Sequence, residues 1–324
     1  LIPIEVDPPD QKKFRKLLDP LFAPQKMARL EEPVRDLVNR LIDDLGDARE
    51  IDFTRQFSIP LPSQVFLTLL GLPLADTPKF LAMKDGIIRP FHVLGVPYSD
   101  PACVEYQQAT GQSIYDYFDA ILDEREREPR DDLLSHFLAA EVDGDRLSRT
   151  DILDICFLFL IAGLDTVTSS LECFFRYLAE HPDQRAELVA DPTITPRVVE
   201  ELLRWETPVM LVARRATSDT EIQGCPVHAG DDVFTFLGSA NTDEAEFSDA
   251  DVVRFDRDEN RHIAFGGGIH RCLGSHLARL ELRVALTEWH RRIPDYRIAP
   301  GANLDFTVGV RSLDTFPMVL GESL

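Results

Sequence analysis

Cysteine is scarce in this sequence and basic residues are outnumbered. Its 324 residues include 5 cysteines, far apart and without a CxxC pair, which excludes a disulfide-rich scaffold and is typical of reduced thiols in the cytoplasm. Lys and Arg number 34 against 56 Asp and Glu, so the net charge is −22. That charge argues against nucleic acid or an anionic membrane as the main partner, because both select basic proteins.

Long hydrophobic runs and targeting signals are also missing. The most apolar stretch, Ile155 to Leu164, ends at Asp165 after ten uncharged residues, whereas a membrane-spanning helix needs about 20. The stretch therefore predicts the buried part of a core helix and no membrane span. No basic segment precedes an apolar one as in a secretory signal. We expect a soluble, cytoplasmic protein.

The composition that remains is that of an ordinary globular protein. Hydrophobic residues make up 44% and charged residues 28% of the chain, and disordered and collagen-like classes are excluded. The length allows one or two domains. Because no repeat, linker or shift in composition divides the chain, we expect residues 1–324 to form a single domain.

Helical periodicity is the dominant pattern. Apolar residues spaced by three and four predict helices over 24–45, 114–126, 148–180, 195–205 and 273–292. The third would begin with a capping box from Ser148 to Asp151 and end before Pro182, and the fourth would have Thr195 as its N-cap. Strands are expected within 220–236 and, as short edge strands, at 296–298 and 316–320. The fold class is mainly α with small β-sheets.

A glycine-rich loop carries the clearest chemical signal. Residues 265–274 read FGGGIHRCLG and directly precede the last predicted helix. Glycines let a large planar ligand approach the backbone closely. Cys272 would lie near the free N–H groups of that helix, which favour a thiolate. A thiolate on an open loop suits an axial metal ligand.

Two other interpretations of this region are weaker. A phosphate-binding GxGxxG loop does not fit, because Arg271 stands at its final position. Zinc could be imagined between His262, His270, Cys272 and His276, with the last two one helical turn apart. Their spacing matches no common zinc pattern.

The loop resembles the haem-binding loop of cytochromes P450, whose pattern is F-x-x-G-x-[HR]-x-C-x-G, at every fixed position. The resemblance implies a cytochrome P450 fold and a haem b cofactor, iron protoporphyrin IX. Cys272 would be its axial thiolate, with Phe265 packed beside the sulfur. His270 would hydrogen-bond a haem propionate, and Gly266 and Gly274 would contact the cofactor.

Two upstream segments extend the resemblance in the expected order. Glu201 and Arg204 form an ExxR motif on one helix face, similar to the buried structural pair of the family. Residues 214–217 resemble the family's R-x-A-T segment, which implies that Arg214 binds a propionate through its planar fork. Arg215 would then face outward.

The central helix carries the stretch 162–166, which reads AGLDT. In any core helix this stretch could be a glycine that weakens the helix, followed by two polar residues whose side chains hydrogen-bond to the nearby backbone. It resembles the A-G-x-[DE]-T signature of the family. That resemblance implies that Ala162 and Gly163 leave room for dioxygen, that Thr166 hydrogen-bonds it, and that Asp165 relays protons from solvent.

Near the start, residues 8–15 read PPDQKKFR and resemble the family's P-P-[DE]-H-x-x-[FY]-R segment. Arg15 would reach a propionate, and Gln11 replaces the usual histidine while still able to donate one hydrogen bond. Family members usually carry more chain before this segment. We therefore expect the N-terminal part of the usual domain, with much of its small sheet and substrate-covering loop, to lie outside these 324 residues.

The implied activity is a haem-dependent monooxygenase that hydroxylates an apolar organic molecule with O₂. No flavin or iron–sulfur signature occurs, so two electrons would come from a separate ferredoxin- or flavodoxin-type donor. We expect Arg271, Arg279 and Arg283 to form a basic docking patch. Alternatives are a haem-thiolate protein that uses peroxide or acts as a sensor, and a helical scaffold with a passive Cys272.

The substrate pocket is expected from analogy alone. The residues that would lie above the haem are apolar: Leu158, Ile161, Ala162, Met210 and Val212. Such a lining suits a terpenoid, a steroid, a fatty-acyl chain or a small aromatic molecule. An ordinary hydrophobic core would show the same pattern.

Overall fold

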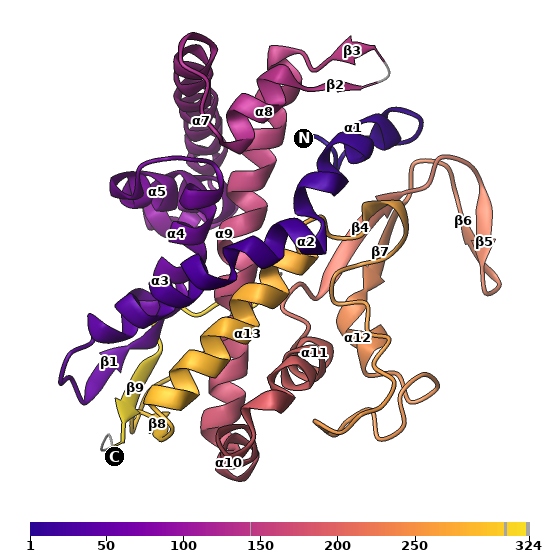
Figure 1. Cartoon of the computed structure of the whole chain (residues 1–324). Coiled ribbons are helices and arrows are strands. Elements are labelled where there is room, and N and C mark those ends of the chain that lie inside the picture. Colours follow the sequence, from indigo (N-terminus) through magenta and orange to yellow (C-terminus); the bar gives the residue numbers. More distant parts are fainter. Residues whose placement is uncertain (143, 308–309, 322–324) are drawn as a thin grey trace.

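The computed structural model describes residues 1–142, 144–307 and 310–321. It is mainly helical, as expected (Figure 1). The helices are α1 Asp10–Leu18, α2 Pro24–Met27, α3 Glu31–Asp43, α4 Pro60–Leu69, α5 Thr77–Ile88, α6 Pro90–Leu94, α7 Pro101–Arg127, α8 Leu133–Ala139, α9 Arg149–Glu180, α10 Pro182–Ala190, α11 Thr195–Glu206, α12 Leu237–Asn241 and α13 Ser275–Arg292. Short 3₁₀ turns lie between them, and residues Thr54–Ser58 form a π-helical turn, η3.

The strands are short. They are β1 Glu50–Asp52, β2 Glu141–Val142, β3 Asp145–Arg146, β4 Leu211–Arg215, β5 Thr220–Ile222, β6 Cys225–Val227, β7 Asp232–Phe236, β8 Tyr296–Ile298 and β9 Pro317–Leu320. All pairings are antiparallel, in the order β1-β9-β8 in one sheet and as β2-β3, β4-β7 and β5-β6 pairs. The two predicted C-terminal strands exist. Strand β9 lies in the middle of its sheet and not at an edge, because it pairs with β1 as well as with β8. Strand β1 was not predicted.

Helix α9 runs through the middle of the molecule (Figure 1). The predicted capping box is present, since Ser148 accepts from the Asp151 N–H and the Asp151 carboxylate accepts from the Ser148 N–H. Pro182 starts α10 directly after the helix. Among the described residues α9 is the one helix long and apolar enough to cross a membrane, and 67% of its most apolar window is buried. It is the core helix.

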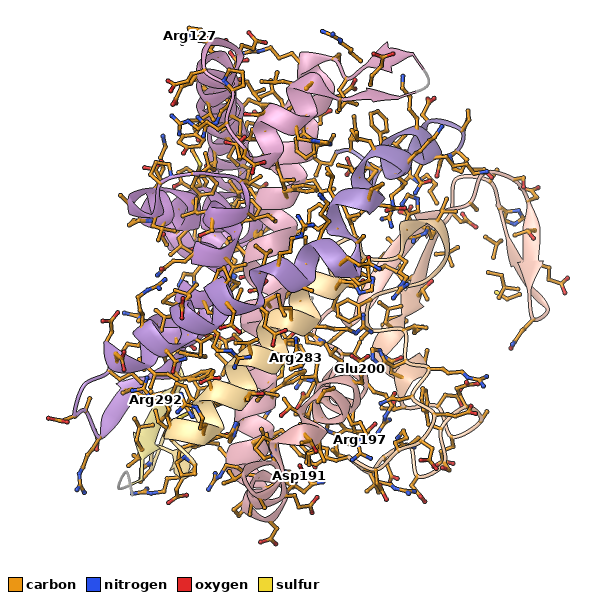
Figure 2. The ribbon with its side chains drawn as sticks, viewed as in Figure 1. Arg127, Asp191, Arg197, Glu200, Arg283 and Arg292 are labelled. Atoms are coloured by element: carbon orange, nitrogen blue, oxygen red, sulfur yellow. The ribbon has the colours of Figure 1, made fainter. Side chains whose placement is uncertain are left out.

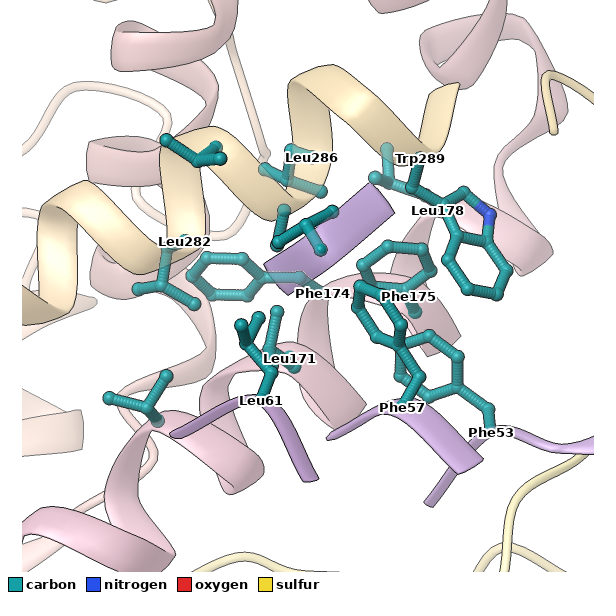
Figure 3. Close-up of a cluster of buried hydrophobic side chains, with 14 of the residues drawn as sticks. Phe53, Phe57, Leu61, Leu171, Phe174, Phe175, Leu178, Leu282, Leu286 and Trp289 are labelled. Carbon is teal, nitrogen blue, oxygen red and sulfur yellow. The ribbon is translucent and has the colours of Figure 1, made fainter. Parts of the chain in front are cut away.

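Aromatic side chains pack α9 against α13 and the chain around η3 (Figure 3). The ring centroids of Phe53 and Phe175 lie 4.4 Å apart, and Trp289 of α13 meets Phe57 edge-on at 4.8 Å. All four side chains are fully buried. This cluster fixes α13, and thus the loop before it, to the central helix.

The N-terminal helical region departs from the expected single helix over 24–45. It consists of α2, a 3₁₀ turn at Ala28–Leu30 and α3. Pro33 explains the break, because its ring would clash with the carbonyl of Arg29 in a continuous helix. The helix expected at 114–126 is longer and starts at Pro101, capped by the Asp100 side chain.

At α11 the predicted start was one residue late. Its N-cap is Ile194, and Thr195 lies in the first turn, where its hydroxyl donates to the Pro192 carbonyl at 2.7 Å. The predicted β-rich segment 220–236 contains the β5-β6 hairpin, and β7 pairs with β4 instead of extending that hairpin.

Candidate haem site

The loop before α13 has an unusual backbone. Gly266 and Gly268 have φ values of +67° and +66°, a left-handed conformation that favours glycine. The Cys272 N–H donates to the Phe265 carbonyl at 2.9 Å, which closes the loop on itself. A Cβ added at Gly266, Gly268 or Gly274 would meet no atom within 4 Å. The loop therefore presents open backbone surface next to the cysteine.

Cys272 lies at this surface with an accessible side chain. Burial by the surrounding protein raises the pKa of its thiol, whereas the Gly274 N–H and the charges of Arg15, Arg279 and Arg271 lower that pKa. The N–H group at the start of α13 thus lowers the pKa of the thiol, as expected, but the increase caused by burial is larger. A sulfur that is recessed but accessible is consistent with both observations. A bound metal ion would deprotonate such a thiol outright.

Helix α1 holds the loop from the other side. The buried Gln11 amide donates to the Ile269 carbonyl at 2.7 Å, and Arg15, one turn later, donates to the Arg271 carbonyl at 2.9 Å. This anchoring to backbone carbonyls was not predicted from the sequence. The contacts of Gln11 and Arg15 with a propionate stay predictions.

Positive charge gathers near His270. Burial lowers the pKa of its imidazole, the nearby charges of Arg214 and Arg15 lower that pKa further, and the Asp7 carboxylate opposes them. The Arg214 guanidinium is exposed and, among the residues that the structure describes, donates only to the neighbouring Ala213 carbonyl. Two carboxylates are a fitting ligand for such a cluster. Arg215 is exposed and paired with Asp232 at 3.0 Å, so it faces outward as expected.

Glu201 and Arg204 form a buried two-pronged ion pair, with distances of 2.8 and 2.9 Å. The Arg204 guanidinium also donates to three backbone carbonyls between α12 and the cysteine loop, those of Asn241, Ala250 and Val252. Glu201 accepts from the Arg254 N–H and from the Arg257 guanidinium. The pair therefore organises the irregular chain that leads to Cys272.

The expected basic patch after Cys272 is largely neutralised, and this expectation was wrong. Arg279 makes a two-pronged ion pair with Glu200 at 2.6 and 2.8 Å. Arg283 pairs with Glu31 of α3 at 2.7 Å. Glu200 and Glu31 were not considered in the sequence analysis. The ExxR motif directly follows Glu200, but nothing in the sequence indicated this partner.

The middle of α9 is open to the surface at one point. Ala162 is exposed although Leu160 and Leu164 are almost fully buried. Thr166, one turn after Ala162, is partly exposed and its hydroxyl donates to the Ala162 carbonyl at 3.1 Å. Gly163 faces elsewhere, because an added Cβ would lie 3.1 Å from the Phe66 ring. The contact of Gly163 with the cofactor stays a prediction. What the structure gives is the close packing of this glycine against the Phe66 ring.

Asp165 is buried and paired with two cations. Its carboxylate accepts from Lys84 at 3.0 Å and from Arg89 at 2.8 Å. Burial alone would raise the pKa of Asp165, but the charges and hydrogen bonds of Lys84 and Arg89 lower it. Neither cation was predicted from the sequence, because both lie on or just after α5, far from α9 along the chain.

The predicted pocket residues lie on α9 and around the start of β4, and their meeting in one pocket stays a prediction. Leu158, Ala162 and Thr166 are spaced by four and therefore share a face of α9. Met210, just before β4, is exposed, and Val212 is half-buried. Two cavities lie elsewhere, one of about 240 Å³ beside α11 and α13 and one of about 570 Å³ between α5 and α7. Neither contains a predicted pocket residue.

The residues present fit a haem better than a zinc ion. Within the described ranges no group of three or more His, Cys, Asp and Glu side chains could hold a metal ion. An accessible cysteine on open glycine backbone, next to cations suited to carboxylates, matches the donor set that a porphyrin with an axial thiolate requires.

Comparison with known proteins agrees with this geometry. The cytochrome P450 family profile matches residues 3–292. The mycinamicin IV hydroxylase/epoxidase of Micromonospora griseorubida is 32% identical over 311 residues, which span 95% of this chain and 76% of that protein. The steroid C26-monooxygenase of Mycolicibacterium smegmatis is 35% identical over 300 residues, or 92% of this chain and 74% of that protein.

Solved structures give the same result. The cytochrome P450 PksS of the Bacillus subtilis bacillaene polyketide synthase has a TM-score of 0.90 at 30% identity, over 98% of this chain and 80% of PksS. P450BioI, solved with a hexadec-9Z-enoic acid-ligated acyl carrier protein, has a TM-score of 0.89 at 27% identity, over 97% of this chain and 80% of that one. The chain therefore belongs to the cytochrome P450 family of haem-dependent monooxygenases.

Proposed function

We propose that this protein hydroxylates an apolar small molecule with O₂ and two electrons from a separate donor. The observation that carries the proposal is the accessible Cys272 on its open glycine loop, in a chain of this family. We also propose that residues 1–324 act as one domain and that the protein works in the cytoplasm, where reduced cysteines and small electron carriers are found.

In the proposed site, Cys272 would supply the sulfur ligand of the haem iron, and Arg15, Arg214 and His270 would hold the propionates. When bound through a thiolate, haem activates dioxygen so that one oxygen atom enters a C–H bond and the other leaves as water. The protein's task is to orient the cofactor and exclude bulk water. The loop and α1 do this by fixing the backbone around Cys272.

Thr166 and Asp165 are proposed to deliver the two protons that the reaction consumes. The Thr166 hydroxyl lies at the accessible stretch of α9 and can leave the Ala162 carbonyl to donate elsewhere. Asp165 is held ionised by Lys84 and Arg89. It can pass a proton onward only if one of these pairs opens, so the cations would control proton delivery.

The electron donor is proposed to bind beside the cysteine loop. With Arg279 and Arg283 paired internally, exposed cations include Arg271 of the loop and, on α1 and α2, Lys12 and Lys26. Arg29 follows directly after α2. We propose that Lys12, Lys26, Arg29 and Arg271 together form a basic face, which would suit an acidic ferredoxin or flavodoxin despite the overall negative charge.

A large, apolar substrate is favoured. The relatives include enzymes named for a macrolide, a steroid and methyl-branched lipids. All five predicted pocket residues are apolar, which agrees with that class. A panel of one macrolide, one steroid and one branched fatty acid should produce spectral shifts on binding for at least one compound. Turnover of that compound with O₂ and an artificial reductase should give a hydroxylated product, and the absence of any oxygenated product would contradict the proposal.

A further inference from the structure

Arg279 of α13 contacts both Glu200 and the haem loop. Its guanidinium binds the two Glu200 carboxylate oxygens at 2.6 and 2.8 Å. The same guanidinium lies over the Phe265 ring, 4.4 Å from the ring centroid. A planar guanidinium can make both contacts at once, which an ammonium group cannot.

Glu200 has a second partner at the start of the loop. The His262 side chain is almost fully buried, and its Nε2 lies 3.0 Å from a Glu200 carboxylate oxygen. Because His262 Nδ1 accepts from the Ala264 N–H, Nε2 carries the proton and donates to Glu200. Glu200 therefore links α11, the loop and α13, and Figure 2 shows it on α11 beside α13.

These contacts act on the surroundings of Cys272. Phe265 is joined to Cys272 through a carbonyl-to-N–H hydrogen bond. Arg279, held on the Phe265 ring, therefore places its positive charge beside the loop that carries Cys272. Glu200 offsets that charge, so the pair adds little net charge near the sulfur. Removing Glu200 would leave the positive charge of Arg279 unbalanced, and removing Arg279 would leave the negative charge of Glu200 unbalanced.

We propose that Glu200 is a positioning residue that holds Arg279 on the Phe265 ring and offsets its charge, and thereby sets how readily the haem on Cys272 accepts an electron. This inference rests on Cys272 as the haem ligand proposed above. It assigns Arg279 an internal task in place of the docking role expected from its sequence position.

The test is a pair of opposite charge changes measured by equilibrium reduction of the purified haem protein against a reference dye. Glu200→Gln leaves Arg279 uncompensated, so the reduction equilibrium constant should rise about three- to tenfold. Arg279→Gln leaves Glu200 uncompensated and should lower the constant by a similar factor. The double variant should return close to the wild-type value.

Arg283→Gln is the matched control, because Arg283 lies one turn further along α13 and pairs with Glu31 instead. It should change the constant far less. Should Arg279→Gln fail to fold, Arg279→Lys keeps the charge next to Glu200 but cannot also hold the Phe265 ring, so its constant should lie between that of the wild type and the raised constant of Glu200→Gln. Shifts in the same direction, or none, would overturn the inference.

The absorption of the reduced, carbon monoxide-treated protein separates the two proposals. If the wild-type protein lacks the red-shifted Soret band of a thiolate-ligated haem, the proposed ligand is wrong. If the band is present in every variant but the constants do not move in opposite directions, only the role of Glu200 is wrong.

Discussion

The side chains near the site differ in how many partners hold them. Arg204 is fully buried and its guanidinium donates to Glu201 and to three backbone carbonyls. A buried charge without a partner is far more costly than an exposed one. Replacing different residues around the cysteine loop should therefore lower the stability of the protein by different amounts.

Replacing Arg204 with leucine should destabilise the protein by about 3–5 kcal/mol, because Glu201 is left buried with one cation fewer and three carbonyls lose their donor. Urea unfolding measures this. The exposed Arg215, paired with Asp232, is the matched control, and its change to leucine should cost about 1 kcal/mol or less. Equal losses for both variants would contradict the proposed role of the buried pair.

Replacing Thr166 with alanine should uncouple electron use from product formation, because the hydroxyl at the accessible stretch of α9 is lost while the fold is kept. The ratio of product formed to reductant consumed should fall, with peroxide or water released instead. Thr168, whose hydroxyl is buried against Ser58, is the control. A sensor or a peroxide-using enzyme should be little affected by the Thr166 change.

Among the elements, α9 and α5 show how buried polar groups and close packing connect distant segments. Glu172 of α9 accepts hydrogen bonds from Thr54 and Ser58 of the π-helical turn at 2.9 and 3.0 Å, and from the Leu313 N–H at 2.8 Å. One carboxyl thus ties the turn and the C-terminal segment to the core helix.

This carboxyl should make stability depend on pH. Burial raises the pKa of Glu172 from 4.5 to about 7, although the hydrogen bonds to its carboxylate act in the opposite direction. The folded protein then holds a proton that the unfolded chain releases. The contribution of Glu172 to the unfolding free energy is fully present below about pH 4.5 and is lost as pH rises to about 7. Glu172→Gln should flatten that decline in denaturant titrations, and an unchanged slope would contradict this.

Close packing of α5 on α7 depends on Gly86. A Cβ at this position would lie 2.6 Å from the Thr110 hydroxyl and 2.9 Å from its methyl group. Gly86→Ala should therefore cost about 1–3 kcal/mol by overpacking, although alanine is the better helix former. Adding Thr110→Ala should restore most of the loss, and thermal unfolding of the single and double variants measures both effects.

The elements that were predicted from the sequence are those determined by residues close together in the chain. The capping box of α9 and the stop at Pro182 were predictable, as was α13 with its glycine loop. The break at Pro33 was visible in the sequence but was overlooked. The partners of Asp165 and Arg279 were not predictable, because Lys84, Arg89 and Glu200 come from other elements and only the packed fold brings them together. Strand β1 was missed because three residues carry too little pattern.

For the whole molecule, the distribution of charge matters more than its sum. The net charge of −22 would repel an acidic electron donor, whereas the basic face around Lys12, Lys26, Arg29 and Arg271 is exposed. Electrostatic steering acts mainly on association rates and weakens with salt. The docking proposal can therefore be tested by rate and ionic strength together.

Reversing two charges of the basic face, Lys12→Glu and Lys26→Glu, should slow reduction by an acidic ferredoxin at least several-fold at low salt and weaken its salt dependence. Lys79, which lies over the Tyr117 ring on the α5–α7 side, provides a control reversal that should have little effect. Equal effects of both reversals would place the donor elsewhere.

The most direct measurement is the absorption spectrum of the reduced, carbon monoxide-treated protein, in the wild type and in Cys272→Ala. We expect a strongly red-shifted Soret band from the wild type, because Cys272 is accessible on open glycine backbone. The band should be absent from Cys272→Ala. A wild-type protein without the band, or a band that survives loss of Cys272, would contradict the assignment of the haem ligand.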